Sequence, residues 1–215
     1  MDEKSIIEAL KKAKEASKKR NFAQSVDLII TLKGLDMKKP DNQVDLFIVL
    51  HHPKGKESKV CALIGPETKE SAKTCDKVIL EDEFKKYQTD KKLLKNLVND
   101  YDFFIAQANL MPKIATTFGR VLGPNGKMPN PKAGCVVPPK ANLGPVVEKL
   151  KNTIRASAKV QPMIQCIIGK EDMDEKQIVD NILTVYKQIA SHVPNESNNI
   201  KSVLIKLTMG KPVKV

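Results

Sequence analysis

A stretch of glycine, proline and basic residues near the middle of the chain has the composition of a phosphate-binding loop. It spans residues 119–137 and reads GRVLGPNGKMPNPKAGCVV. Its glycines and prolines interrupt helices and strands, so backbone N–H groups can approach an anion closely. Arg120, Lys127 and Lys132 add positive charge, and the stretch contains no acidic residue. The pattern indicates a basic loop that contacts phosphate, but an ordinary surface connection shaped by turns has the same composition.

The known nucleotide-binding fingerprints do not fit this stretch. A P-loop requires glycine five residues before the glycine of a Gly-Lys-Ser/Thr triplet, but Val121 stands there and Met128 follows Lys127. No G-x-G-x-x-G, G-x-S-x-G or H-E-x-x-H motif occurs. The acidic run at residues 81–83 is explained by a helix N-terminus. We therefore predict a protein that is not an enzyme and needs no cofactor, with an enzyme for a phosphorylated ligand as the alternative.

The charge and composition indicate a globular protein with a polyanionic partner. The chain has 215 residues, 41% of them hydrophobic, with a net charge of +12 that is spread along the whole sequence. Nucleic acid is the expected partner, because a membrane-surface protein would need a basic amphipathic helix with large apolar anchors. Only 4% of the residues are aromatic. We therefore expect RNA to be recognised by shape, 2′-hydroxyl and phosphate contacts rather than by bases stacked on a sheet.

The cysteines and histidines do not form a recognisable metal site or disulfide framework. Cys61, Cys75, Cys135 and Cys166 lie far apart without a C-x-x-C pair. The adjacent histidines at 51–52 are expected on opposite faces of a strand, so no metal is expected. The N-terminus is charged, and no apolar run approaches the ~20 residues that span a bilayer. Free thiols without a signal peptide indicate a cytoplasmic protein.

The hydrophobic periodicity predicts an α/β protein with two domains. An α+β domain would combine residues 1–54 with 153–215, and a Rossmann-like three-layer α/β domain, residues 55–152, would be inserted into it. Short apolar strands that alternate with helices indicate a parallel sheet in the inserted domain. The helices are expected at residues 2–19, 66–75, 81–98, 111–118, 145–152 and 174–192. The strands are expected at residues 26–32, 44–51, 60–64, 78–80, 103–106, 135–137, 160–168 and 202–209.

Two short segments of the terminal domain have residue types that suit contact with folded RNA. The first, residues 20–25, lies where the first helix leads into a strand, and the second, residues 208–211, ends the last strand. Glycine would admit the RNA backbone, and hydroxyl groups could bond a 2′-hydroxyl. The alternative is that Phe22 fills the core and that the second segment is an ordinary strand end. The candidate residues are Arg20, Asn21, Phe22, Ser25, Thr208, Met209, Gly210 and Lys211.

Three separated motifs carry a resemblance to a known family. They read RNFAQSVDLIITLKGLD, GRVLGPNGKMPNPKAG and LTMGKPVKV, and they resemble the large-subunit ribosomal protein family L-one in its archaeal form. The resemblance implies that the terminal domain binds large-subunit rRNA through the candidate residues above, and it adds Lys159 and Gln165 from the same face. It implies a mobile rRNA stalk beside the E site as the binding site and help with release of E-site tRNA. It further implies repression of the protein's own mRNA and a protein that is monomeric when free.

Overall fold

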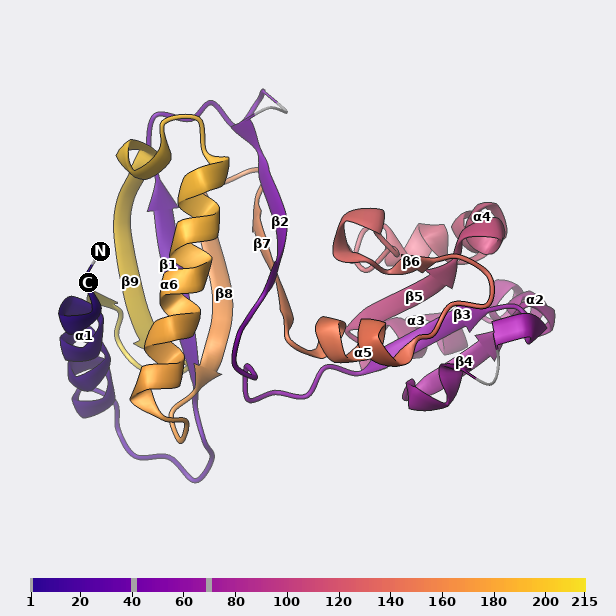
Figure 1. Cartoon of the computed structure of the whole chain (residues 1–215), viewed down its shortest axis with the longest axis horizontal. Helices are drawn as coiled ribbons and strands as arrows, with labels where there is room; N and C mark the ends of the chain where they lie inside the picture. Colours follow the sequence, from indigo (N-terminus) through magenta and orange to yellow (C-terminus); the bar gives the residue numbers. More distant parts are fainter. Residues whose placement is uncertain (1, 40–41, 69–70) are drawn as a thin grey trace. The chain divides into compact units, whose positions relative to one another are not determined.

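The chain folds into two compact α/β units (Figure 1). The structure is a computed structural model that describes residues 2–39, 42–68 and 71–215. The terminal unit comprises residues 1–56 and 152–215, and the inserted unit comprises residues 57–151.

A four-stranded antiparallel sheet organises the terminal unit. Its order is β10-β9-β1-β8, so the first strand of the chain lies between two strands from its far end. Alternate β1 residues such as Leu28 face the core, where Leu28 pairs with Cys166 on one side and Ile205 on the other. The strands are β1 (Ser25–Leu32), β8 (Met163–Lys170), β9 (Ile200–Leu207) and β10 (Val213–Lys214).

Two amphipathic helices contribute to the same core as this sheet. In α1 (Glu3–Glu15), Ile6, Leu10 and Ala13 recur at helical spacing and are buried. The longer α6 (Glu175–His192) is capped by Asp174, whose carboxylate accepts the Lys176 N–H at 3.3 Å. No helix among the described residues is long and apolar enough to cross a bilayer.

A two-stranded antiparallel ribbon connects the terminal unit to the insertion. It joins β2 (Val44–Val49) to β7 (Thr153–Ala158), and Val49 pairs with Thr153. β7 was not predicted from the sequence. The one strand expected over residues 160–168 is wrong at its start, where a turn around the 86% exposed Val160 precedes β8. Since two paired residues flank the insertion, its two ends leave the ribbon side by side.

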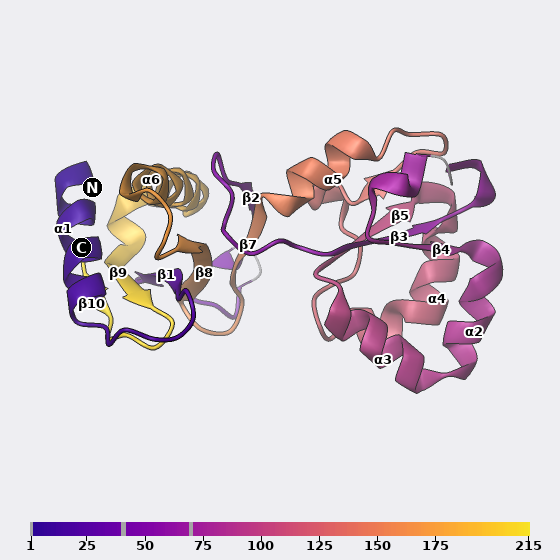
Figure 2. The same cartoon turned by 90° about the horizontal axis from the view of Figure 1, so that it is seen from below.

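The inserted unit is a three-layer α/β structure. Its parallel sheet has the order β4-β3-β5-β6. Figure 2 shows α5 (Gly144–Lys151) on one face and the other α-helices of the unit on the opposite face. Those helices are α2 (Phe84–Thr89), α3 (Lys91–Asp100) and α4 (Met111–Leu122), and the strands are β3 (Val60–Ile64), β4 (Lys77–Leu80), β5 (Phe103–Gln107) and β6 (Val136–Val137).

Two predicted helices of the inserted unit differ from the structure. The helix expected over 66–75 is replaced by two 3₁₀ turns, η2 (Pro66–Thr68) and η3 (Ser71–Thr74), and residues 69–70 lie outside the described residues. The helix expected over 81–98 begins as the 3₁₀ turn η4 (Glu81–Glu83) and breaks at Asp90. The Asp90 carboxylate accepts the N–H groups of Lys92 and Leu93 at 2.8 and 3.2 Å, so it starts a new helix.

The two adjacent histidines follow β2 and turn toward the same carboxylate. His51 Nδ1 lies 3.0 Å and His52 Nε2 lies 3.4 Å from Asp180 Oδ2. The expectation that they occupy opposite faces was wrong, because β2 ends at Val49 and the histidines lie in a bend. Among the described residues, no group of three or more His, Cys, Asp or Glu side chains is placed to hold a metal ion.

The chain leaving β2 is anchored by a buried asparagine of α6. Asn181 is fully buried, its Oδ1 accepts the His52 N–H at 3.1 Å, and its Nδ2 donates to the His52 carbonyl at 3.2 Å. Nδ2 also donates to the Ile168 carbonyl at 3.1 Å. The Asn181 side chain therefore ties the segment that leads from β2 to the insertion to both α6 and β8.

We expect Asn181→Ala to destabilise the terminal unit by about 2–4 kcal/mol, because it leaves three backbone groups without their partner in a buried place. Chemical denaturation followed by circular dichroism measures this loss. Gln188→Ala, an exposed change on the same helix, should alter the free energy of unfolding by about 0.5 kcal/mol or less. Equal stability of the two variants would contradict an anchoring role for Asn181.

Candidate nucleic-acid interface

The start of β1 and the end of β9 meet at one end of the terminal sheet, the lower end in Figure 1. Ser25 N–H donates to Thr208 Oγ1 at 3.0 Å, and Thr208 Oγ1 donates to the Ser25 carbonyl at 3.3 Å. The Thr208 N–H reaches the same carbonyl at 3.1 Å. The Thr208 hydroxyl thus clamps two strand ends and retains one acceptor lone pair for an outside group.

A buried glutamine organises the loops around this clamp. Gln24 is 2% exposed, and its Oε1 accepts the Met209 N–H at 3.2 Å. Its Nε2 donates to Ser17 Oγ at 3.0 Å and to Glu171 Oε2 at 3.5 Å. The side-chain amide of Gln24 therefore links three loops, which follow α1, β8 and β9. Gln24 was not among the residues expected from the sequence, because a lone glutamine before a strand gives no signal of its partners.

Two large apolar side chains project from this end of the sheet. Phe22 is 53% exposed and Met209 is 62% exposed, so the alternative in which Phe22 fills the core is wrong. Gly210 lies in the same turn and donates its N–H to the Leu207 carbonyl at 2.9 Å. A Cβ at Gly210 would touch Leu207 at 3.4 Å, an ordinary contact, so the fold itself does not require glycine there. We call residues 20–25 and 208–211 the sheet-end cluster.

The charged and amide members of the sheet-end cluster lie on the surface. Arg20, Asn21 and Lys211 are exposed, and in the described part of the chain neither Arg20 nor Lys211 has an ion pair. Long cationic side chains without a fixed partner can reach phosphates on either side of the apolar tip. The cluster thus combines exposed backbone, two apolar contacts and cations.

Gln165 and Lys159, the two residues added by the resemblance, do not join this cluster. Gln165 is exposed on β8, where it pairs with Ile29 in the middle of the sheet. Lys159 lies between β7 and β8 at the opposite end of β8, and its Nζ is 2.9 Å from Asp45 Oδ2. Arg155 holds the same carboxylate through two N–H groups at 2.8 and 2.9 Å. Lys159 therefore belongs to an ion-pair network of the β2–β7 ribbon.

The basic residues of the glycine-rich stretch have three different environments. Arg120 belongs to α4, which continues through Leu122, and Lys132 is exposed in a 3₁₀ turn. Lys127 turns inward, and its ammonium donates to the carbonyls of Val98 and Tyr101 at 2.7 and 2.8 Å. The ammonium thus satisfies two carbonyls where α3 ends.

The backbone geometry explains two glycines of this stretch. A Cβ at Gly123 would lie 2.8 Å from the Gly119 carbonyl oxygen, so any other residue would force the backbone at the end of α4 to shift. Gly134 has a φ of +74°, a left-handed conformation that favours glycine. The stretch is therefore shaped largely by the end of α4 and the turn before β6, as in the alternative of an ordinary surface connection.

Comparison with known proteins adds an independent line of evidence. Residues 10–211 match the Ribosomal protein L1p/L10e family. The chain belongs to this family. It is 41% identical over 216 residues to the "Large ribosomal subunit protein uL1" of Methanocaldococcus jannaschii, covering all of this chain and 96% of the relative. It is 42% identical to the protein of the same name from Thermococcus kodakarensis, covering 100% and 98%. With the relative from Methanothermobacter thermautotrophicus the identity is 40%, covering 98% of each chain.

The Asp45 network of this L1p/L10e family member predicts an acid-dependent stability. Hydrogen bonds from Arg155 are the main reason that the pKa of Asp45 falls from 3.8 to about 2. The carboxylate therefore stabilises the fold above its unfolded pKa, and this contribution disappears as the pH falls from 3.8 toward 2. We expect Asp45→Asn to cost about 1 kcal/mol at neutral pH, after solvent screening, and to flatten this acid dependence. Denaturation between pH 2 and 7 measures it, with Asp172→Asn as the exposed control.

The inward position of Lys127 predicts a stability defect rather than a loss of charge alone. We expect Lys127→Ala to destabilise the inserted unit by about 1–3 kcal/mol, because two carbonyls near the end of α3 lose their donor. Lys132→Ala removes the same charge from an exposed site and should change the free energy of unfolding by about 0.5 kcal/mol or less. Urea denaturation measures both, and equal effects would show that the Lys127 bonds contribute nothing.

Proposed function

We propose that this protein is a component of the large ribosomal subunit that binds large-subunit rRNA through the sheet-end cluster. The observation that carries the proposal is the exposure of Phe22 and Met209 on loops held rigidly by Gln24 and by the Thr208 clamp. An exposed apolar tip costs free energy in water unless a partner covers it. The positive net charge of +12 and the names of the relatives favour rRNA as that partner.

The cluster offers RNA a mixture of contacts that requires little side-chain reordering. Phe22 and Met209 would lie against a base or sugar, and the remaining acceptor position of Thr208 would take a hydrogen from a 2′-hydroxyl. Gly210 would let the RNA backbone approach the turn, while Arg20 and Lys211 would neutralise phosphates. We assign rRNA contact to Arg20, Asn21, Phe22, Ser25, Thr208, Met209, Gly210 and Lys211. Gln165 would extend the contact along the open sheet face.

The resemblance to the family supports a more detailed role. We propose that the rRNA target is the mobile stalk near the E site and that the protein aids release of E-site tRNA. Arg120 and Lys132 would supply secondary basic contacts. A similar RNA structure in its own mRNA would bind the same cluster, which would repress translation of its operon. The protein would be monomeric when free and would act in the cytoplasm as part of the ribosome.

The geometry of the inserted unit disfavours the enzyme alternative. In open α/β sheets, ligands bind at the carboxyl ends of the strands. Here the Gln107 side chain, 2% exposed at the end of β5, fills this place between β3 and β5. Its Oε1 accepts the Gly65 N–H at 2.8 Å and the Thr68 hydroxyl at 3.5 Å. The Gln107 side chain thus occupies the hydrogen-bond donors that a bound phosphate would need.

We expect the double change Phe22→Ala/Met209→Ala to weaken binding of a stalk rRNA fragment about tenfold or more, because an aromatic contact with a base contributes roughly 1–3 kcal/mol. Folding should be preserved, since both side chains are more than half exposed. Filter binding at several salt concentrations measures the affinity. The slope of log affinity against log salt should persist, because the phosphate contacts remain.

The matched control is Leu93→Ala/Val160→Ala, which removes two large exposed apolar side chains outside the cluster. This control should bind the stalk fragment within about twofold of the unchanged protein. Equal affinity of the cluster and control variants would refute the assignment of rRNA contact to the sheet end.

A further inference from the structure

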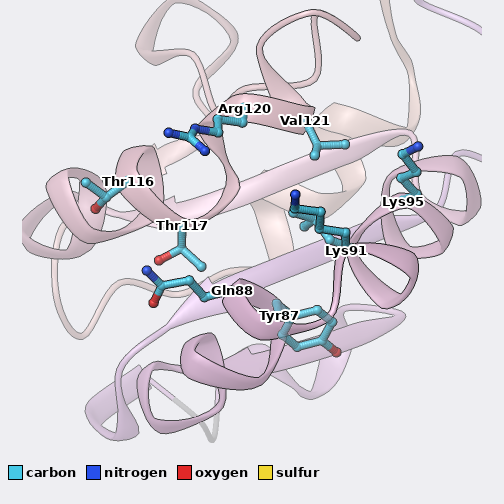
Figure 3. Close-up of a pocket in the computed structure, with 9 residues that line it drawn as sticks. Tyr87, Gln88, Lys91, Lys95, Thr116, Thr117, Arg120 and Val121 are labelled. Carbon is cyan, nitrogen blue, oxygen red and sulfur yellow. The ribbon is translucent and has the colours of Figure 1, made fainter.

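Helices α2, α3 and α4 lie on the side of the sheet opposite α5 (Figure 2). Together they line an open cavity of about 350 Å³ (Figure 3). This volume is at the lower end of the range for small-ligand sites. The wall comes from the end of α2, the first turns of α3 and the last turns of α4. The side chains that line it are Tyr87, Gln88, Lys91, Leu94, Lys95, Thr116, Thr117, Arg120 and Val121.

The charged groups of this cavity are all cations. Lys91, Lys95 and Arg120 are exposed and have no ion pair within the described ranges, and no carboxylate is among the lining side chains. In the neighbouring hollow, by contrast, Lys113 is paired with Glu81. Three unpaired cations around one hollow concentrate a positive potential there.

The placement of these cations is unfavourable for the fold alone. Lys91 is the first residue of α3, where the helix dipole disfavours positive charge and the Asp90 carboxylate offsets part of this cost. Lys95 lies one turn later, and a like-charged pair at this spacing costs about 0.2–0.5 kcal/mol. Both unfavourable placements would be relieved by an anion in the cavity.

The neutral lining has groups that suit a sugar. Figure 3 shows the side chains of Gln88 and Thr117 next to one another on one side of the cavity, and neither has a hydrogen-bond partner in the part of the chain that the structure describes. Thr116, in contrast, bonds to carbonyls of its own helix at 2.8 and 3.0 Å. Leu94 and Val121 supply apolar surface, which strengthens electrostatic contacts by limiting water.

We propose that this cavity binds one nucleotide unit of an RNA strand. The phosphate lies against Lys91 and Arg120, and the ribose hydroxyls bond to Gln88 and Thr117. A duplex is disfavoured, because its successive phosphates need a row of cations rather than one hollow. The site lies in the inserted unit, so it goes beyond the proposed function of the sheet-end cluster and does not depend on it.

The test is a titration of the full-length protein with a ten-residue oligouridylate, followed by amide NMR signals. We expect chemical-shift changes to concentrate at Tyr87, Thr117 and Val121. Lys91→Gln/Arg120→Gln should lower the affinity at least tenfold and reduce the slope of log affinity against log salt by about 0.7, the value for one phosphate of a single strand. The control Lys86→Gln/Lys92→Gln removes the same charge from exposed positions of α2 and α3 outside the cavity and should lower the affinity less than threefold.

Two further ligands identify the source of the nucleotide. If uridine monophosphate saturates the same signals at concentrations as low as the oligonucleotide does, the cavity is supported as a nucleotide site. Its ligand is then a free nucleotide. Weaker monophosphate binding supports the RNA strand. Inorganic phosphate that binds as well as the monophosphate overturns the nucleotide assignment.

Either of two results would overturn the proposed site. One is chemical-shift changes spread over all lysines, and the other is an equal loss of affinity in the cavity and control variants. Circular dichroism confirms folding, and Lys95→Gln serves as a second, milder cavity variant. The Phe22→Ala/Met209→Ala protein should keep the cavity signals, so failure of the sheet-end proposal is distinguishable from failure of this one.

Discussion

The pairing of β1 with two strands from the far end of the chain is the constraint on which the rest of the structure depends. Because β1 lies between β8 and β9, Ser25 comes to Thr208 across a separation of 183 residues. The sheet-end cluster therefore exists only in the folded terminal unit. The same arrangement lets β2 and β7 pair beside the sheet and bring both ends of the insertion together. The discontinuous unit and the candidate interface are two consequences of one topology.

Strands with a clear apolar pattern were predictable, and those defined by their partners were not. The β3 bounds agree with the predicted range of 60–64, since VCALI is apolar throughout. The missed β7 reads TIRASA, with small and polar residues, and it is a strand because β2 pairs with it and Arg155 binds Asp45. The break at Asp90 was missed for a related reason. Helical spacing continues on both sides, and only the cap bonds of the Asp90 carboxylate reveal the interruption.

The candidate site shows the same division. The resemblance to the family, rather than the residue types alone, indicated Phe22, Thr208 and Met209 as contact residues, and the structure leaves Phe22 and Met209 exposed. The roles of Gln24 and of the Thr208 hydroxyl could not be predicted, because each depends on a backbone group that folding brings from a remote segment. The Gln24 side chain and the Thr208 hydroxyl form hydrogen bonds that hold the loops in shape. Their value for RNA contact lies in preorganisation, which lowers the entropy cost of ordering the loops on binding.

Charge counted along a sequence overstates the charge available to a partner. The ammonium of Lys127 satisfies carbonyls, Lys159 neutralises Asp45, and Lys113 is paired with Glu81. The glycine-rich stretch had the strongest electrostatic pattern in the sequence, yet one of its three cations is internal to the fold and another faces a cavity formed by helices. The net charge therefore governs long-range attraction of RNA, whereas the place of contact is decided by which cations the fold leaves without a carboxylate or carbonyl partner.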